Sequence, residues 1–381
     1  MALLNIDVSA TPVSIVAYSF IGITYLAILY GIYGALFTFF QFLRVGRKRF
    51  FQRVDRPSPP SKAMDPIYGN HEMIKLKSSG ISLHYVSKGL PNQRMLLFVH
   101  GFPECWYSWR NQIKHFSKKY RVVAIDQRGY GLSSKPPFVS DYRIEALAGD
   151  VADVIEQLGY ESCVLVGHDS GGYVVWATAV LYPHLIEKLI IMNCPHPGAF
   201  RRELTLSQIH RSWYIFFSQI PFLPELSFQA DDFSIFKRAF HEKPTALVNK
   251  NNITDEDINV YKYTFSQKGE IYLYLIYISF IFYIKIGTTK AALNYFRALF
   301  RYQNHFSTVQ ITAPVLLLWG CPDPTLNEGL ADASQAFCSD LRIKKIPNAS
   351  RWINQDLPDA VNKYIEVFLN ETPDIEAPYD F

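Results

Sequence analysis

The chain is 381 residues long, enough for one large domain or two smaller ones. Its formal net charge is +4, and no long basic block occurs outside the stretch after residue 43, so the composition does not indicate binding to nucleic acid. Hydrophobic residues make up 49% of the sequence, which suffices for a large core and a membrane segment as well.

The N-terminal region predicts a membrane anchor. No charged residue occurs from Val8 to Leu43, and about 20 apolar residues are enough to span a bilayer. A cleaved signal peptide is the alternative, but it requires basic residues before a short apolar stretch, and the charge there is Asp7. We therefore expect residues 1–62 to form a transmembrane helix and a proline-rich linker.

The basic residues that directly follow the apolar stretch predict its orientation. The positive-inside rule places such a flank in the cytosol. We expect a single-pass protein of the endoplasmic reticulum membrane, with a lumenal N-terminus and a cytosolic body. The five cysteines agree with this compartment, because their number is odd and none forms a Cys-x-x-Cys pair. The basic residues are Arg44, Arg47, Lys48, Arg49 and Arg53.

From residue 63 to residue 381, short apolar runs alternate with helical patterns. The runs are apolar almost throughout, as in strands that are covered on both faces. The alternation predicts an α/β architecture, with a mostly parallel sheet and helices on both of its faces. The expected strands are Met95–Val99, Arg121–Ile125, Cys163–Val166, Leu189–Met192, Val315–Trp319 and Leu341–Ile346. The expected helices are Tyr142–Leu158, Gly172–Leu181 and Pro358–Leu369.

This alternation stops between Gly198 and Asn304. The stretch is aromatic and lacks short buried strands. We interpret residues 198–304 as a mostly helical lid, inserted into a core domain that comprises residues 63–197 and 305–381.

A sharp turn after the expected strand Cys163–Val166 carries the main catalytic signal. Residues 167–172 (GHDSGG) fit the nucleophile elbow, in which the residues two before and two after the nucleophile must be small. This register makes Asp169 the nucleophile. If Ser170 were the nucleophile instead, His168 would occupy a position that needs a small residue. The remaining alternative is a tight turn with a capping Asp.

Residues 100–104 (HGFPE) follow the expected strand Met95–Val99. The backbone N–H groups of Phe102 and Ser170 are expected to form an oxyanion hole, facing the oxygen that becomes charged. In such motifs a residue like His100 more often braces the loop than acts as a catalytic base. No phosphate-binding glycine loop and no His/Cys cluster at metal spacing occurs, so we expect no cofactor and no metal.

Four motifs, in this order, resemble those of the epoxide hydrolases, most closely the membrane-anchored animal branch. They are residues 100–110 (HGFPECWYSWR), 126–131 (DQRGYG), 167–172 and 193–197 (NCPHP). The resemblance implies an α/β-hydrolase fold with a helical lid. It also implies an enzyme in which a carboxylate opens the epoxide to form an ester, and a His–acid pair then activates water to cleave that ester.

The resemblance assigns roles to three residues. Asp169 matches the nucleophile, and Tyr214 matches the first of two lid tyrosines that donate a proton to the departing oxygen. Asp323 matches the acid that orients the catalytic histidine, although from its surroundings alone it would be a turn residue.

Two positions depart from the family in the catalytic machinery. Arg351 stands where the histidine belongs, and arginine stays charged and cannot accept a proton. It could pair with Asp323 or Asp169 and lower the pKa of that carboxyl. Phe296 stands where the second lid tyrosine belongs, and the neighbouring Tyr295 is expected to point elsewhere on the helix.

Two further departures concern specificity and the lid. Ser170 replaces the tryptophan with which the related haloalkane dehalogenases hold the halide, which counts against dehalogenation. Residues 270–287 (EIYLYLIYISFIFYIKIG) are an insertion whose β-branched and aromatic composition does not suit a helical lid. A retained intron and a genuine elaboration of the lid are the two explanations.

Three functions remain open from the sequence. The first is an impaired epoxide hydrolase that alkylates Asp169 and turns over slowly or not at all. The second is a fully active one that uses another base, or in which Arg351 is a sequence error. The third is a non-catalytic membrane protein that binds a lipid or a partner. The aromatic lid and the anchor favour small lipophilic epoxides or lipids as ligands.

Overall fold

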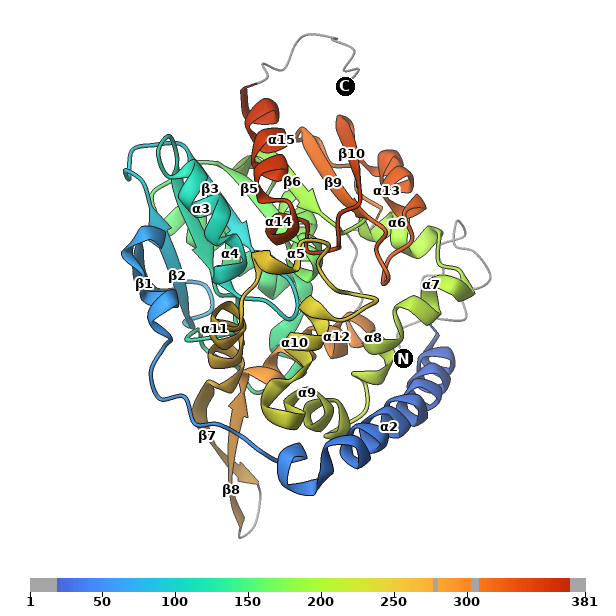
Figure 1. Cartoon of the computed structure of the whole chain (residues 1–381). Helices are drawn as coiled ribbons and strands as arrows, with labels where there is room; N and C mark the ends of the chain where they lie inside the picture. The colour runs from blue at the N-terminus through green and yellow to red at the C-terminus, as the bar shows by residue number, and fades with distance from the viewer. Residues whose placement is uncertain (1–18, 277–279, 303–307, 371–381) are drawn as a thin grey trace.

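The computed structural model describes residues 19–276, 280–302 and 308–370, and its centre is an eight-stranded sheet (Figure 1). The strand order is β1-β2-β4-β3-β5-β6-β9-β10. The pairs β1–β2 and β2–β4 are antiparallel and all the others are parallel, so the prediction of a mostly parallel sheet is confirmed. The strands are β1 (Asn70–Lys75), β2 (Ser82–Lys88), β3 (Met95–Val99), β4 (Arg121–Ile125), β5 (Cys163–His168), β6 (Ile186–Met192), β9 (Val315–Cys321) and β10 (Leu341–Pro347).

The apolar runs of the sequence become the buried centre of this sheet. Every residue of β3 and of β5 is buried, because helices cover both faces of these strands. All six expected strands are present, some of them a few residues longer than expected. The two strands that the sequence did not reveal, β1 and β2, form the antiparallel end of the sheet, where β1 is partly exposed and has a polar sequence.

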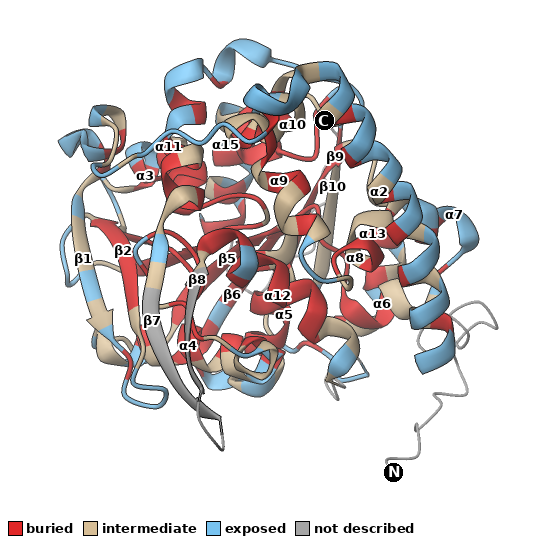
Figure 2. Ribbon diagram, turned by 90° about the horizontal axis from the view of Figure 1, so that it is seen from below, coloured by how far each residue is buried: buried red, intermediate tan, exposed pale blue. Residues whose placement is uncertain are grey.

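Helices pack on the two faces of the sheet, as Figure 2 shows by their buried inner sides. The three expected helices correspond to α4, α5 and α15, and α5 begins three residues earlier than expected, at Asp169. The helices of the core are α3 (Arg110–Phe116), α4 (Ile144–Gln157), α5 (Asp169–Leu181), α13 (Gly329–Ala333), α14 (Ile353–Asp356) and α15 (Pro358–Asn370).

A helical layer between β6 and β9 covers the carboxyl ends of the parallel strands. Hydrogen bonds tie it to the core: the Tyr295 hydroxyl donates to the Arg128 carbonyl (2.7 Å), and the Tyr107 hydroxyl donates to Asp257 (2.7 Å). The helices of this lid are α6 (Pro197–Arg202), α7 (Leu206–Arg211), α8 (Trp213–Phe217), α9 (Leu223–Phe233), α10 (Ile235–His241), α11 (Asp255–Ser266) and α12 (Thr288–Arg301).

The unusual insertion forms an antiparallel hairpin between α11 and α12. Its strands are β7 (Lys268–Ile276) and β8 (Phe280–Gly287), and they pair with each other apart from the central sheet. The base of the hairpin is closed, because the Thr288 N–H donates to the Gln267 carbonyl (3.1 Å). The end of α11 and the start of α12 therefore lie next to each other at the base of the hairpin.

The expected anchor contains the helical segment α2 (Phe20–Phe50), which begins after the capping residue Ser19 and is kinked at Gly46, whose φ is 76°. By its length and composition α2 is a candidate membrane span. The part of the expected anchor before Ser19 lies outside the described residues. In the structure α2 lies along the lid, against α8 and α9 (Figure 1).

Candidate active site

The turn between β5 and α5 is a nucleophile elbow with Asp169 at its tip. β5 ends at His168, α5 begins at Asp169, and Asp169 has a φ of 52°, in the left-handed region that side chains rarely adopt. Space at the turn is very limited: a Cβ on Gly171 would lie 2.3 Å from the His100 carbonyl oxygen, and a Cβ on Gly167 would lie 2.8 Å from the Gly171 carbonyl oxygen. The small residues are therefore required at the positions where the sequence has them.

Two backbone N–H groups converge on the carboxylate at this tip. The Phe102 N–H donates to Asp169 Oδ1 (3.0 Å), and the Ser170 N–H is hydrogen-bonded to the same carboxylate. These are the two residues expected to form the oxyanion hole. The loop approaches closely because residue 101 is glycine, whose added Cβ would lie 2.5 Å from Asp169 Cβ.

Arg351 binds the other oxygen of Asp169. Its Nη2 forms an ion pair with Oδ2, and its Nη1 donates to the Thr325 hydroxyl. Burial alone would raise the pKa of Asp169, but the charges of Arg351 and His168 and the two N–H groups hold it below its ordinary value. Burial alone would lower the pKa of Arg351, yet Asp169 raises it, so the pair is ionised at any ordinary pH. Of the two partners that the sequence left open for Arg351, the structure selects Asp169.

Asp323 lies in the loop after β9 and is held by its own surroundings. Its Oδ1 accepts hydrogen bonds from the Thr325 N–H and hydroxyl (both 2.8 Å), and its Oδ2 accepts one from Asn193 Nδ2 (3.0 Å). It is buried and close enough to Arg351 to raise the pKa of the guanidinium. Asn193 and Thr325 therefore fix the position of the Asp323 carboxylate.

The lid contributes Tyr214 from α8 and Phe296 from α12. The Tyr214 hydroxyl oxygen accepts a hydrogen bond from Arg351, and burial raises the pKa of Tyr214, so the hydroxyl stays protonated beside the ion pair. The Phe296 ring packs edge-on against Tyr214 (5.6 Å between centroids) and against Phe102 (5.0 Å). Phe296 therefore lies beside the site, but its side chain has no hydroxyl group. The hydroxyl of Tyr295 is directed to the Arg128 carbonyl, away from Asp169.

Two histidines near Asp169, His168 and His100, are engaged in other contacts. Both ring nitrogens of His168 face acceptors, Glu104 (2.6 Å) and the Arg351 carbonyl (2.8 Å), so the ring carries two protons and has no lone pair to offer. His100 bonds the Gly101 carbonyl (2.8 Å) and the Gln127 N–H (3.2 Å), which makes it a brace of the loop. Among the described residues no histidine lines the cavity that contains Asp169, and His305 falls outside those residues.

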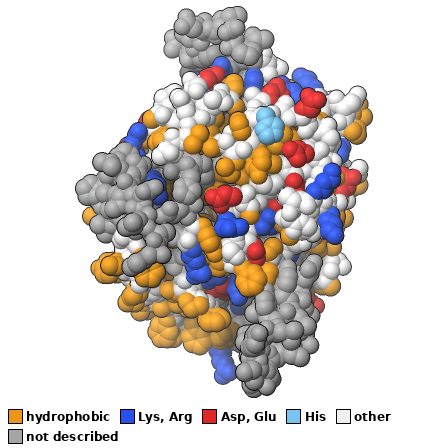
Figure 3. All heavy atoms as spheres, turned by 180° about the vertical axis from the view of Figure 1, so that it is seen from behind, with side chains coloured by type: hydrophobic (Ala, Val, Ile, Leu, Met, Phe, Trp, Pro, Cys, Tyr) orange, Lys and Arg blue, Asp and Glu red, His pale blue; other side chains and the backbone are white. Residues whose placement is uncertain are grey.

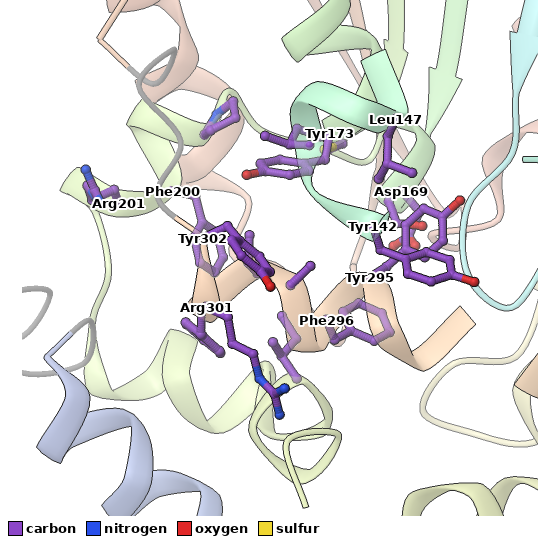
Figure 4. Close-up of a pocket in the computed structure, with 18 of the residues that line it drawn as sticks. Tyr142, Leu147, Asp169, Tyr173, Phe200, Arg201, Tyr295, Phe296, Arg301 and Tyr302 are labelled. Carbon is purple, nitrogen blue, oxygen red and sulfur yellow. The ribbon is translucent and has the colours of Figure 1, made fainter. Parts of the chain in front are cut away.

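The site opens into a cavity of about 370 Å³ between the core and the lid (Figure 4). Asp169, Ser170 and Tyr214 lie in its wall, together with many aromatic and aliphatic side chains. Phe20 and Ile23 of α2 also line it, which the sequence did not indicate.

Two other residues of the site were not assigned a role from the sequence. Thr325 binds Arg351 and Asp323, and Asn193 holds Asp323 and Gly320, its Oδ1 accepting from the Gly320 N–H at 2.9 Å. Asn193 was part of a recognised motif, whereas Thr325 had no sequence signal.

Known proteins show the same fold and sequence pattern. A family model described as "alpha/beta hydrolase fold" matches residues 94–356. "Epoxide hydrolase 1" of Caenorhabditis elegans is 42% identical over 300 residues, which cover 78% of this chain and 70% of that protein. "Epoxide hydrolase 4" of Homo sapiens is 36% identical over 333 residues, which cover 86% of both chains. An inhibitor complex of the Bacillus megaterium epoxide hydrolase has a TM-score of 0.67 at 32% identity, and the match covers 79% of this chain and 100% of that one. The chain belongs to the epoxide hydrolase family of the α/β-hydrolase fold.

Proposed function

We propose that this protein opens lipophilic epoxides through an ester on Asp169 and then hydrolyses that ester slowly or not at all. The observation that carries the proposal is the ion pair between Arg351 and Asp169, at the position where the family has its catalytic histidine. General-base assistance is worth about 10²–10⁴ in rate, and its loss falls on the hydrolysis step.

Opening of the ring needs two groups that the site holds. An oxygen of the Asp169 carboxylate attacks an epoxide carbon, the bond from that carbon to the ring oxygen breaks, and the oxygen takes a proton from the Tyr214 hydroxyl. Arg351 affects this step as well, because a carboxylate oxygen that is paired with a guanidinium is a weaker nucleophile. The Asp169 ester is therefore expected to form more slowly than in a member with histidine.

Hydrolysis of the ester needs a base that the described residues do not supply. Attack of water on the ester carbonyl develops negative charge on the oxygen that the N–H groups of Phe102 and Ser170 face. The protonated Arg351 and His168 cannot take the proton from that water. The N–H groups of Phe102 and Ser170 can therefore stabilise the charge that develops during hydrolysis, but the general base for that step is missing.

Two other functions compete with this one. A fully active hydrolase would need another base. His305 is one candidate, because it follows the cavity residue Tyr302 closely in the sequence, although it lies outside the described residues. A non-catalytic protein would use the same apolar cavity to bind a lipid, with the charge of Asp169 neutralised by Arg351. In each case we propose attachment to the endoplasmic reticulum membrane through α2, with the body in the cytosol.

The proposal is tested by mass spectrometry of the intact protein after incubation with an epoxide such as styrene oxide. The mass should increase by one substrate, the peptide that carries Asp169 should contain the addition, and the adduct should persist after the epoxide is removed. Asp169→Asn is the control and should gain no mass. Rapid diol release without an adduct would favour an active hydrolase, and His305→Ala would then show whether His305 is the base. Absence of both adduct and diol would favour the binding role.

A further inference from the structure

Helix α2 forms part of the wall of the catalytic cavity. The cavity extends from Asp169 and Tyr214 to Phe20 and Ile23, which lie in the first turns of α2. The side chains along it are mainly apolar, and Figure 4 shows Asp169 at one side and Phe200, Arg201 and Arg301 toward the other. A helix from outside the core and lid thus borders the end of the cavity that lies away from the nucleophile.

One face of α2 is packed on the lid over most of its length. Small side chains allow the approach: a Cβ on Gly34 would lie 2.2 Å from the ring of Phe217. Near the N-terminal half, Tyr30 stacks on Phe216 (5.9 Å between ring centroids). At the C-terminal end, the Arg49 guanidinium pairs with Asp231 of α9 (2.7 Å).

The opposite face of α2 is apolar and exposed. Figure 2 shows the outer side of α2 as exposed. Figure 3 views the molecule from behind, so that α2, at the lower right of Figure 1, falls at its lower left, where hydrophobic side chains gather. Two apolar residues of the lid are also exposed, Leu206 at the start of α7 and Phe222 just before α9. Besides the cavity residue Phe20, the large exposed apolar residues of α2 are Ile21, Tyr25, Ile28, Leu29, Ile32, Tyr33, Leu36, Phe37, Phe39, Phe40 and Leu43, of which Tyr33 and Phe37 also contact the lid.

Basic residues continue this apolar face at its C-terminal end. Arg44, Arg47 and Lys48 are exposed there, within or just after the last turns of the apolar segment. An apolar helix face that is bordered by Lys and Arg matches a membrane leaflet, in which acyl chains adjoin anionic phosphates. The chemistry of this surface is therefore that of a lipid bilayer.

A bilayer can meet α2 in two ways, and the lid contacts decide between them. A helix that crosses the membrane is surrounded by lipid, so α2 would have to leave α8 and α9 or carry lid residues such as Arg238, which lies over the Phe37 ring, into the hydrocarbon. A helix that lies in the plane of one leaflet keeps its inner face on the lid and buries its outer face about 5–10 Å deep. The single crossing that the sequence predicts stays a prediction, and it requires a rearrangement of these contacts.

We propose that α2 lies in the plane of one leaflet while packed on the lid, and that the end of the cavity beside Phe20 and Ile23 opens into that leaflet. A lipophilic epoxide then reaches Asp169 from the acyl-chain region without passing through water. The entry of an epoxide rests on the proposed function, whereas the position of α2 does not.

The position of α2 is tested by labelling single cysteines with an environment-sensitive fluorophore and quenching them with nitroxide lipids in vesicles of phosphatidylcholine and phosphatidylserine. Cys321, the half-buried native cysteine, is first replaced by Ser. Labels at Ile21→Cys, Ile32→Cys and Leu43→Cys should report one shallow depth, and Ile23→Cys should be quenched with them. A label at Val367→Cys on α15, which is exposed on the core, should not be quenched.

Two results would overturn the position. In a crossing helix the labels at residues 21 and 43 lie about 33 Å apart along the axis, so residue 32 would be the deepest and the ends would be at opposite surfaces. Absence of quenching at all sites would mean that this face does not meet lipid. Neither result depends on epoxide chemistry.

The entry route has its own test with a long-chain epoxide dissolved in the vesicles. Ile23→Trp should slow formation of the Asp169 adduct several-fold, because the larger side chain fills the mouth of the cavity. Ile32→Trp, on the outer face of the same helix, is the matched control and should leave the rate unchanged. Equal rates for both variants and the unaltered protein would contradict entry beside Ile23.

Discussion

Arg351 affects two properties of the Asp169 carboxylate at once, its charge and the availability of its oxygens. Burial opposes ionisation of Asp169, and the guanidinium is the strongest of the groups that overcome it. The same contact ties up one carboxylate oxygen, while the Phe102 N–H binds the other. An ionised carboxylate is thus present at neutral pH, but both of its oxygens are engaged.

The first prediction concerns the pH dependence of alkylation in Arg351→Gln. In the unaltered protein the pKa of Asp169 is depressed, so the adduct should form at a constant rate from pH 8 down to about pH 5. Without the guanidinium, burial raises that pKa, so the rate should be higher at pH 8 and should fall as the pH decreases through the raised value. The rate is measured by intact mass at each pH. Superimposable profiles for the two proteins would show that Arg351 does not set the ionisation of Asp169.

Part of this site could be predicted from the sequence, because the residues of that part lie close together along the chain. The elbow around Asp169 is a local pattern of small residues on a strand–turn–helix, so short-range spacing identifies it. The partner of Arg351 could not be chosen, because Asp169 and Asp323 are both remote along the chain and the packing of the loop after β10 decides between them. Thr325 gave no signal, since its role arises from that same packing.

At the scale of elements, the apolar strands of the parallel part of the sheet were predictable, whereas β1 and β2 of the antiparallel end were not. β3 and β5 are apolar throughout because both of their faces are covered, whereas β1 (NHEMIK) is a partly exposed end strand with a polar sequence. The insertion was recognised as unsuited to a helical lid, and its backbone forms the hairpin β7–β8. The packing of α2 on the lid was not foreseen, because an uncharged segment gives no sign of which protein surface it contacts.

The second prediction concerns deletion of residues 270–287. The hydrogen bond from the Thr288 N–H to the Gln267 carbonyl holds α11 and α12 together at the base of the hairpin, so the two helices should stay in place after the deletion. The segment is rich in residues that promote aggregation when they are exposed. We expect a higher soluble yield and an unchanged or higher melting temperature. A lower melting temperature would show that the hairpin is a packed part of the lid and would argue against a retained intron.

At the scale of the whole molecule, the hydrolase core, the lid and α2 form one continuous unit around the cavity. The core supplies Asp169, the lid supplies Tyr214, and α2 supplies Phe20 and Ile23. Loss of α2 would therefore open the cavity.

The third prediction follows from the apolar outer face of α2. The protein should sediment with microsomal membranes and stay there after washes with high salt and with alkaline carbonate, because its attachment is hydrophobic rather than electrostatic. Protease added to intact microsomes should digest the body, because we propose that the body lies on the cytosolic side. Release by salt alone would contradict a hydrophobic attachment, and complete protection of the body would reverse the orientation.

The measurement that tests the central claim most directly is steady-state diol release by Arg351→His, compared with Arg351→Gln and the unaltered protein. Asp323 is already held by Asn193 and Thr325, so it can orient an imidazole at residue 351. The His variant should release diol faster by on the order of 10² or more, the usual worth of a general base. The Gln variant should accumulate the Asp169 ester without releasing diol, because it loses the ion pair but gains no base. Rapid multiple turnover by the unaltered protein, or equal diol release by the His and Gln variants, would contradict the account.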